Sequence, residues 1–107
     1  GAFDAEVPSH VYTHNYLTGE DLRSLRADGA VGDVCTVFLR ADGTFRDIAM
    51  NQRGSGTGPD RLARIPRRLL VASGSRKALP LRAALRAGVA TDVVVDEITA
   101  ASLLALR

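Results

Sequence analysis

Lys77 is the residue of this chain best suited to binding chemistry, because it is the only lysine among fourteen basic side chains. An ammonium is a compact point charge that suits a phosphate oxygen or attack on a carbonyl, whereas a guanidinium is a broad planar fork. The apolar run that ends at Ala72 is followed by Ser73, Gly74 and Ser75 and then by a helical pattern. This order predicts a strand, a tight loop and a helix N-terminus, where anions collect. The alternative is an ordinary surface lysine.

Carboxylates stand at two other predicted loops. Asp33 follows Gly32 at the entrance to an apolar run, where it could accept hydrogen bonds from sugar hydroxyls, neutralise a basic partner or simply cap a turn. Asp96 and Glu97 follow an apolar strand and open a helix, where acidic residues also complement the helix dipole. Both sites therefore have a structural and a ligand-binding interpretation.

Other reactive groupings are weak. His10 and His14 are four residues apart, a spacing that can hold a metal on a helix, but Pro8 and the interleaved Tyr12 and Tyr16 favour an extended loop. The sequence contains no Ser/His/Asp arrangement, Walker loop or GxGxxG motif. We therefore predict no catalytic residue, no metal site and no cofactor.

The composition indicates a globular protein. The 107 residues are 46% hydrophobic and 24% charged, which fits one domain or part of one. No apolar run approaches the ~20 residues that span a bilayer, and no signal peptide is visible. The single cysteine, Cys35, is expected to be a buried strand residue, with a nucleophilic thiol as the alternative; its lack of a disulfide partner suits the cytoplasm. A net charge of +2 argues only weakly for nucleic acid.

Apolar patterning and turn residues predict the order of elements. The first half should contain a helix from Thr18 to Gly29 and a β-hairpin. The second half should contain a short helix, two buried strands and two further helices. In ranges, we expect a strand at 34–39, a turn at 41–43, a returning strand at 44–50, a loop at 51–59, a helix at 60–65, a strand at 67–73, a helix from 76 or 77 to 88, a strand at 93–95 and a helix to 106.

The second half is typical of a parallel α/β sheet covered on both faces. Pro80 is comfortable only in a first turn, so it fixes a helix start near Lys77. Ligands of such sheets bind beyond the carboxyl ends of the strands. The loops expected at that edge contain Asp33, residues 73–77, and Asp96 with Glu97.

Taken together, several segments resemble the C-terminal effector-binding domain of SorC/DeoR-type bacterial transcriptional regulators, the sugar-binding domain family. The segments that carry the resemblance are Tyr16-Leu17-Thr18-Gly19-Glu20-Asp21-Leu22, Leu25, Gly29-Ala30-Val31-Gly32-Asp33-Val34, Ala41-Asp42-Gly43, Ile65-Pro66, Val71-Ala72-Ser73-Gly74 with Lys77-Ala78, and Asp96-Glu97-Ile98-Thr99-Ala100. Their order and spacing match over nearly the whole chain, and the Gly-Ala-Val-Gly-Asp block is the most specific.

The resemblance implies a Rossmann-like three-layer sandwich with a β-hairpin, related to sugar-phosphate isomerases and coenzyme A transferases. It also implies a sugar or sugar-phosphate effector that alters how a full-length homo-oligomer holds its operator DNA. By this resemblance Asp33 faces the sugar and Lys77 approaches the phosphate, beside the N–H groups that follow Gly74 and include that of Ser75. Asp96 lies at the neighbouring strand end.

This chain departs from the family pattern in three places. Ser73 and Gly74 stand where the family usually has two glycines, and residues 53–58 replace an apolar stretch. The helix-turn-helix and the first half of the effector domain have no counterpart, so residues 1–107 are expected to be the C-terminal part of the domain. Two alternatives stay open: a fragment of a sugar-phosphate isomerase or deaminase, and a structural oligomerisation module.

Overall fold

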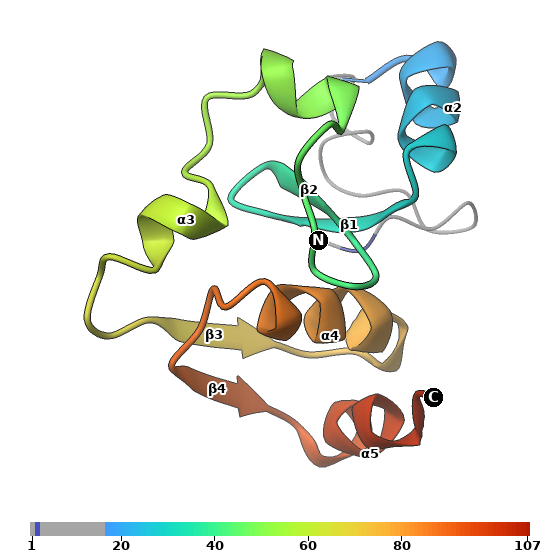
Figure 1. Cartoon of the computed structure of the whole chain (residues 1–107). Coiled ribbons are helices and arrows are strands. Elements are labelled where there is room, and N and C mark those ends of the chain that lie inside the picture. Colours follow the sequence, from blue (N-terminus) through green and yellow to red (C-terminus); the bar gives the residue numbers. More distant parts are fainter. Residues whose placement is uncertain (1, 3–16) are drawn as a thin grey trace.

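The computed structural model describes residue 2 and residues 17–107 of the 107-residue chain, which form both helices and strands (Figure 1). The α/β class predicted from the sequence is confirmed as a small domain of mixed helices and strands. The elements in chain order are α2 (Gly19–Ala27), β1 (Ala30–Val34), β2 (Val37–Arg40), the 3-10 helix η1 (Ala49–Arg53), α3 (Pro59–Leu62), β3 (Leu69–Ala72), the 3-10 helix η2 (Ser75–Lys77), α4 (Ala78–Arg86), β4 (Asp92–Val95) and α5 (Glu97–Ala105).

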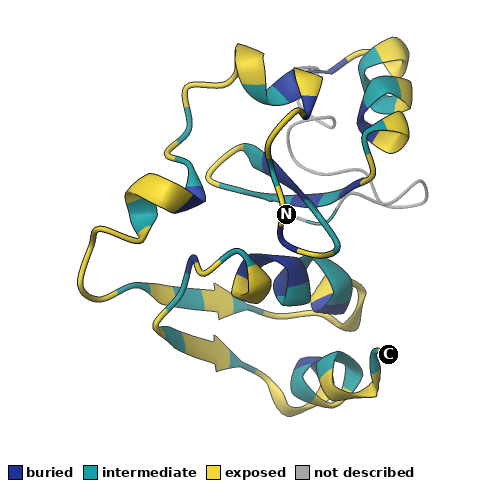
Figure 2. Ribbon diagram, in the orientation of Figure 1, coloured by how far each residue is buried: buried dark blue, intermediate teal, exposed yellow. Residues whose placement is uncertain are grey.

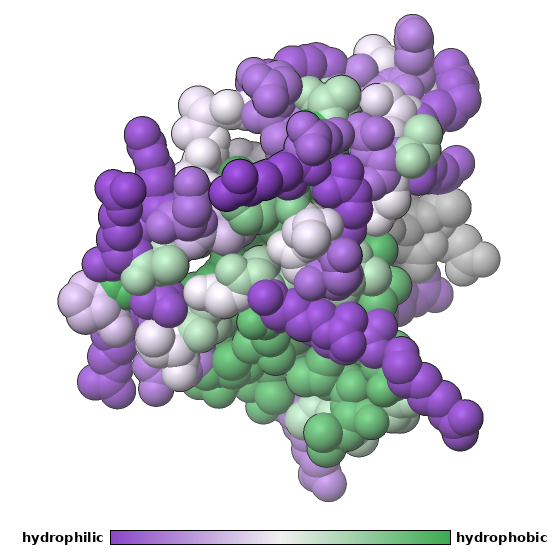
Figure 3. All heavy atoms as spheres, viewed as in Figure 1, coloured by the Kyte–Doolittle hydropathy of each residue, from purple (hydrophilic) through white to green (hydrophobic). Residues whose placement is uncertain are grey.

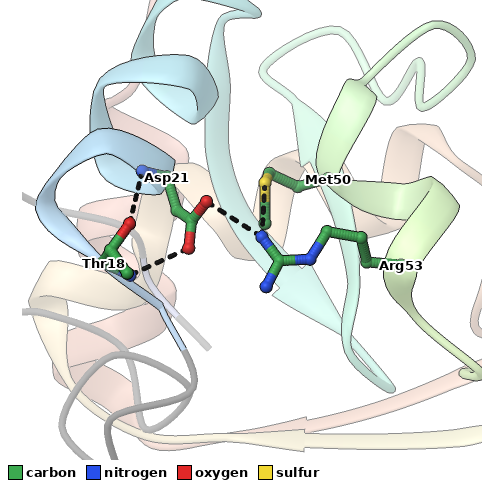
Figure 4. Close-up of polar contacts among 4 residues, drawn as sticks. All are labelled: Thr18, Asp21, Met50 and Arg53. Atoms are coloured by element: carbon green, nitrogen blue, oxygen red, sulfur yellow. Dashed lines mark hydrogen bonds and ion pairs between the residues drawn. The ribbon is translucent and has the colours of Figure 1, made fainter.

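Helix α2 begins where the sequence predicts. The Thr18 side chain accepts a hydrogen bond from the Asp21 N–H, and the Asp21 carboxylate accepts one from the Thr18 N–H, which completes a capping box. The hydrogen bond from the Thr18 backbone is the main reason that the pKa of Asp21 lies below its ordinary value. Arg53 also contacts Asp21 at 2.9 Å and Met50 Sδ at 3.7 Å (Figure 4). The cap of α2 is thereby joined to η1.

The β-hairpin is present, but its turn lies elsewhere than predicted. β1 and β2 pair antiparallel with Val34 opposite Val37, so Cys35 and Thr36 form a two-residue turn, with φ angles of 51° and 64°. The predicted single strand at 34–39 is therefore wrong, and so is the expectation that Cys35 is buried in it, because Cys35 is exposed. Neither turn residue is a glycine, asparagine or aspartate, so the usual sequence signal for such a turn is absent.

A side chain replaces the returning strand that we expected at 44–50. The predicted turn at 41–43 does form, since the Gly43 N–H donates to the Arg40 carbonyl at 2.9 Å. Beyond it, the Asn51 side chain accepts from the Phe38 N–H at 2.7 Å and donates to the Phe38 and Phe45 carbonyls at 3.0 and 3.1 Å. The edge of β2 is thus paired with an amide side chain, and the chain continues into η1 instead of a strand.

Two apolar clusters lie on either side of the hairpin in the described part of the chain. β2 alternates, so that Phe38 faces the cluster under α2 and Leu39 faces the cluster against α4. The cluster under α2 consists of Leu17, Leu25, Ala30, Phe38, Ile48 and Met50. The cluster against α4 is built on Leu39, Ala83, Ala84 and Val89. The hairpin therefore connects the two halves of the domain.

The second half follows the sequence prediction closely. β3 pairs parallel with β4, from Leu69 opposite Asp92 to Ala72 opposite Val95, and α4 makes the crossover. η2 and α4 together begin where Pro80 requires, and Gly88, with φ 74°, follows the end of α4. Helix α3 is shorter than the predicted 60–65, and η1 occupies the start of the predicted loop at 51–59. None of the helices in the described residues is long and apolar enough to cross a membrane.

The prediction that β3 and β4 are covered on both faces is wrong for the described residues. Leu70 packs towards α4, whereas Leu69 and Val71 are 65% and 66% exposed and Val94 is 53% exposed. Alternating exposure along β3 is visible in Figure 2. Figure 3 shows apolar side chains gathered over the half of the molecule that contains these strands. We call Leu69, Val71 and Val94 the outer apolar face.

The Asn51 side chain should be needed for the hairpin. Asn51→Ala is expected to lower the free energy of unfolding by about 1–3 kcal/mol, because it leaves partly buried backbone groups of Phe38 without partners. Gln52→Ala is the matched control: Gln52 is exposed, and its truncation should cost less than about 0.5 kcal/mol. Urea unfolding of both variants measures the difference, and equal stability would contradict the role assigned to Asn51.

Candidate functional site

A small hollow brings together two of the predicted site residues. Asp33 near the end of β1 and Lys77 at the end of η2 both line it, although they are distant in the sequence. Its volume is about 100 Å³, and its remaining lining residues are apolar: Val34, Leu70, Val71, Ala72, Pro80, Leu81 and Ala84. An aspartate and a lysine thus line one hollow together with apolar residues, between the β1–β2 hairpin and the β3–α4 unit.

The loop before Lys77 has the conformation that its sequence suggests. Gly74 has φ 116°, which side-chain-bearing residues rarely adopt, and an added Cβ would meet no atom within 4 Å. Glycine is therefore needed here for its backbone conformation and not for space. The Lys77 N–H donates to the Gly74 carbonyl at 3.0 Å, so Gly74 and Lys77 are held as one turn. Ser75 and Lys77 are exposed.

A hydrogen-bond network ties this loop to the start of α5. The Ser73 hydroxyl donates to Asp96 Oδ2 at 2.5 Å, and Asp96 Oδ1 accepts from the Thr99 N–H at 2.7 Å as the N-cap of α5. The hydroxyl of Thr99, a fully buried residue, accepts from the Gly74 N–H at 2.8 Å. We call these contacts the Ser73–Asp96–Thr99 network. They attach the loop at residues 73 and 74 to the N-terminus of α5.

The network sets the charge state of Asp96. The hydrogen bond from Ser73, followed by those from Thr99, lowers the pKa of Asp96 from 3.8 to about 2. Asp96 is therefore ionised at neutral pH, with each carboxylate oxygen accepting a bond from the protein. Its predicted contact with a ligand stays a prediction, while its capping role, the alternative for Asp96 and Glu97, is observed.

The five predicted ligand-binding residues thus fall into three positions. Asp33 and Lys77 line the hollow, Gly74 and Ser75 lie in the adjoining loop, and Asp96 lies behind that loop. Sequence reasoning missed Thr99, which follows Asp96 by three residues as a capping partner would. Its bond to Gly74 spans 25 residues of sequence, and no local pattern announces it.

Among the described residues, no group of three or more histidine, cysteine, aspartate or glutamate side chains could hold a metal ion. The metal site considered for His10 and His14 lies outside the described residues, as do Tyr12 and Tyr16.

Comparison with known proteins identifies the family. The sequence pattern of the Sugar-bind family, described as a sugar-binding domain, matches residues 1–105. The chain belongs to this family. The resemblance to the sugar-binding domains of SorC/DeoR-type regulators, drawn above from the sequence, is confirmed.

The proteins that this chain resembles are transcriptional regulators. The chain is 35% identical to the transcriptional regulator LsrR of Klebsiella pneumoniae, over 99% of this chain and 33% of that protein. A solved structure described as a domain of a possible sugar-binding transcriptional regulator from Arthrobacter aurescens is 44% identical, with a TM-score of 0.81 over 83% of this chain and 35% of that chain. A DeoR family transcriptional regulator from Listeria monocytogenes is 30% identical, with a TM-score of 0.83 over 91% and 39%.

The match is partial in length. The chain spans about a third of LsrR and less than half of each of these two solved structures. It is a sugar-binding domain of the kind found in transcriptional regulators, and this favours effector binding over catalysis.

The pKa of Asp96 offers a direct test of the network. Ser73→Ala should raise this pKa from about 2 towards 3.8, because the largest stabilising hydrogen bond to the carboxylate is lost. A carboxyl group with a lowered folded-state pKa stabilises the fold above its unfolded pKa, and this contribution is lost as the pH falls through 3.8 towards 2. The variant should therefore be less stable at neutral pH, and the two proteins should converge only below about pH 2, where Asp96 is protonated in both.

Carboxyl-carbon NMR titration measures this shift. Asp42 is an internal control, because its pKa is lowered by the Thr44 hydroxyl and N–H, which Ser73→Ala does not touch. An unchanged Asp96 titration in the variant would contradict the network.

Proposed function

We propose that this chain is the effector-binding part of a sugar-responsive transcriptional regulator and that it binds a sugar or a phosphorylated sugar at the hollow between Asp33 and Lys77. The observation that carries the proposal is that Asp33 and Lys77 line one hollow in a chain of the Sugar-bind family. Binding would favour one arrangement of the full-length protein and thereby change its hold on operator DNA.

The two charged residues suit different parts of such a ligand. The Lys77 ammonium carries three rotatable donors and would hold a phosphate oxygen, a charge-assisted contact worth roughly 1.5–3 kcal/mol. Asp33 would accept hydrogen bonds from sugar hydroxyls, with Gly74 and Ser75 forming the rim on the Lys77 side. Asp96 would act through the loop that it holds.

The hollow is too small to surround a whole sugar phosphate. Ligand pockets usually measure ~300–1,000 Å³, whereas this hollow measures about 100 Å³. It can take the phosphate-bearing end of a sugar or a few of its hydroxyls, and the rest of the ligand would lie outside it. This fits a chain that spans about a third of a relative.

We further infer that the chain is the C-terminal part of a Rossmann-like three-layer domain related to sugar-phosphate isomerase and coenzyme A transferase folds. The parallel β3–β4 pair with its α4 crossover supports this inference. DNA would be bound through a helix-turn-helix outside these 107 residues, in a homo-oligomer. Because bacterial operator DNA is cytoplasmic, the protein would act in the cytoplasm. The relatives are regulators, which favours binding without turnover over an isomerase or deaminase activity.

Substituting Lys77 should separate phosphorylated from plain sugars. Lys77→Ala is expected to weaken binding of an aldose phosphate roughly ten- to hundredfold, the equivalent of ~1.5–3 kcal/mol, and to leave the unphosphorylated aldose nearly unaffected. Arg76→Ala is the matched control, since Arg76 is an exposed neighbour that does not line the hollow. Calorimetric titration measures all the affinities, and equal losses for both sugars would exclude the phosphate role.

Substituting Asp33 should weaken the binding of both kinds of sugar. Asp33→Asn keeps the size of the side chain but removes its charge and one acceptor oxygen, so both the phosphorylated and the plain aldose should lose affinity by roughly three- to tenfold. The same titrations provide the measurement. A loss confined to the phosphorylated sugar would argue against hydroxyl recognition by Asp33.

A further inference from the structure

We propose that Ser73 is a positioning residue for the ligand site: through Asp96 and Thr99 it holds the Gly74 turn in the conformation that places Lys77 at the hollow. This inference rests on the proposed function, because it assigns a purpose to the turn.

A closed set of hydrogen bonds joins the turn to the start of α5. Ser73 leaves β3 and its hydroxyl reaches Asp96 across the loop, while Asp96 caps α5 through the Thr99 N–H. The Thr99 hydroxyl accepts a hydrogen bond from the Gly74 N–H at 2.8 Å. Residues 73 and 74 are therefore both hydrogen-bonded to the N-terminal turn of α5.

A backbone hydrogen bond connects the turn to Lys77. The Gly74 carbonyl accepts from the Lys77 N–H at 3.0 Å, so a movement of Gly74 moves the backbone of Lys77. Lys77 in turn leads directly into α4, the side chains of which, Pro80, Leu81 and Ala84, form a wall of the hollow. The backbone of Lys77 is thus held by α4 on one side and by the network on the other.

The turn itself is exposed. An added Cβ at Gly74 would meet no atom within 4 Å, and residues 73–77 are all exposed. An exposed turn with φ 116° is conformationally costly to hold unless polar contacts select it. The hydrogen bonds to Asp96 and Thr99 therefore help to hold residues 73 and 74 of this exposed turn in place.

The consequence is a preorganised site. With the network intact, Lys77 is presented before the ligand arrives, and binding does not have to order the loop. Without the Ser73 hydroxyl, the loop samples other conformations. Part of the binding free energy from the phosphate contact is then offset by the cost of ordering the loop. Affinity for phosphate should fall while the chemistry of the ammonium is unchanged.

The test uses the labelled 107-residue chain and inorganic phosphate as the probe. Ser73→Ala should accelerate hydrogen exchange of the Gly74 amide by roughly tenfold and weaken phosphate binding, followed by amide shifts, by about three- to tenfold. Ser73→Thr restores a hydroxyl at the same place and should recover both properties. Ser102→Ala, the same change within α5 but outside the network, should alter neither.

A second variant guards against an indirect effect of Ser73. Thr99→Val preserves the branched shape of the buried side chain but removes the acceptor of the Gly74 N–H, so it should accelerate exchange at Gly74 at least as much as Ser73→Ala. If it unfolds the chain, the Ser73→Ala and Ser73→Thr pair decides alone.

The outcomes separate the two proposals. Unchanged Gly74 exchange in Ser73→Ala overturns the inference, and so does faster exchange with unchanged phosphate affinity. If the wild-type chain binds phosphate but Lys77→Ala binds it equally well, the proposed phosphate contact fails, whereas the exchange data still decide whether Ser73 holds the turn. If the wild-type chain shows no phosphate-dependent shifts at all, the positioning role falls together with phosphate binding.

Discussion

The arrangement of this domain depends on how closely two units approach α4. Ala83 is fully buried and Ala84 is 2% exposed, and around them the β1–β2 hairpin and β3 both pack on the same helix. A larger side chain at either position would force the hairpin or β3 outwards, because a packed interior does not absorb extra methylenes without strain. The small side chains of Ala83 and Ala84 therefore allow the hairpin that carries Asp33 to lie close to α4, the helix that follows Lys77.

The sequence was most informative where single residues restrict the backbone. Pro80 fixed the start of α4, Gly88 marked its end, and Thr18 with Asp21 gave the start of α2; the structure confirms each of these positions. The hairpin was misplaced because its turn residues, Cys35 and Thr36, carry no turn signal, whereas Ala41-Asp42-Gly43 carries a strong one. Such a turn forms because the strands on both sides pack well, and packing partners are not visible in a local pattern.

The site was predictable to a similar degree. Asp33 and Lys77 do line one hollow, but the predicted reason was wrong for Asp33. We expected Asp33 in a loop at the edge of the parallel sheet, whereas it lies within β1, in an antiparallel sheet separate from β3 and β4. The network of Ser73, Asp96 and Thr99 was not predictable, since it joins hydroxyl and carboxylate groups more than twenty residues apart. Asp96 illustrates the difference: its sequence position allowed both capping and ligand binding, and only the coordinates show the cap.

The outer apolar face has a thermodynamic consequence for whatever comes to cover it. Leu69, Val71 and Val94 present apolar side chains to water on one side of a parallel strand pair, a kind of sheet that proteins usually bury on both faces. Removing this area from water would release ordered hydration with a negative heat-capacity change and little enthalpy near room temperature. An association through this face would accordingly weaken on cooling, while the charge-assisted contacts at the hollow would respond to salt instead.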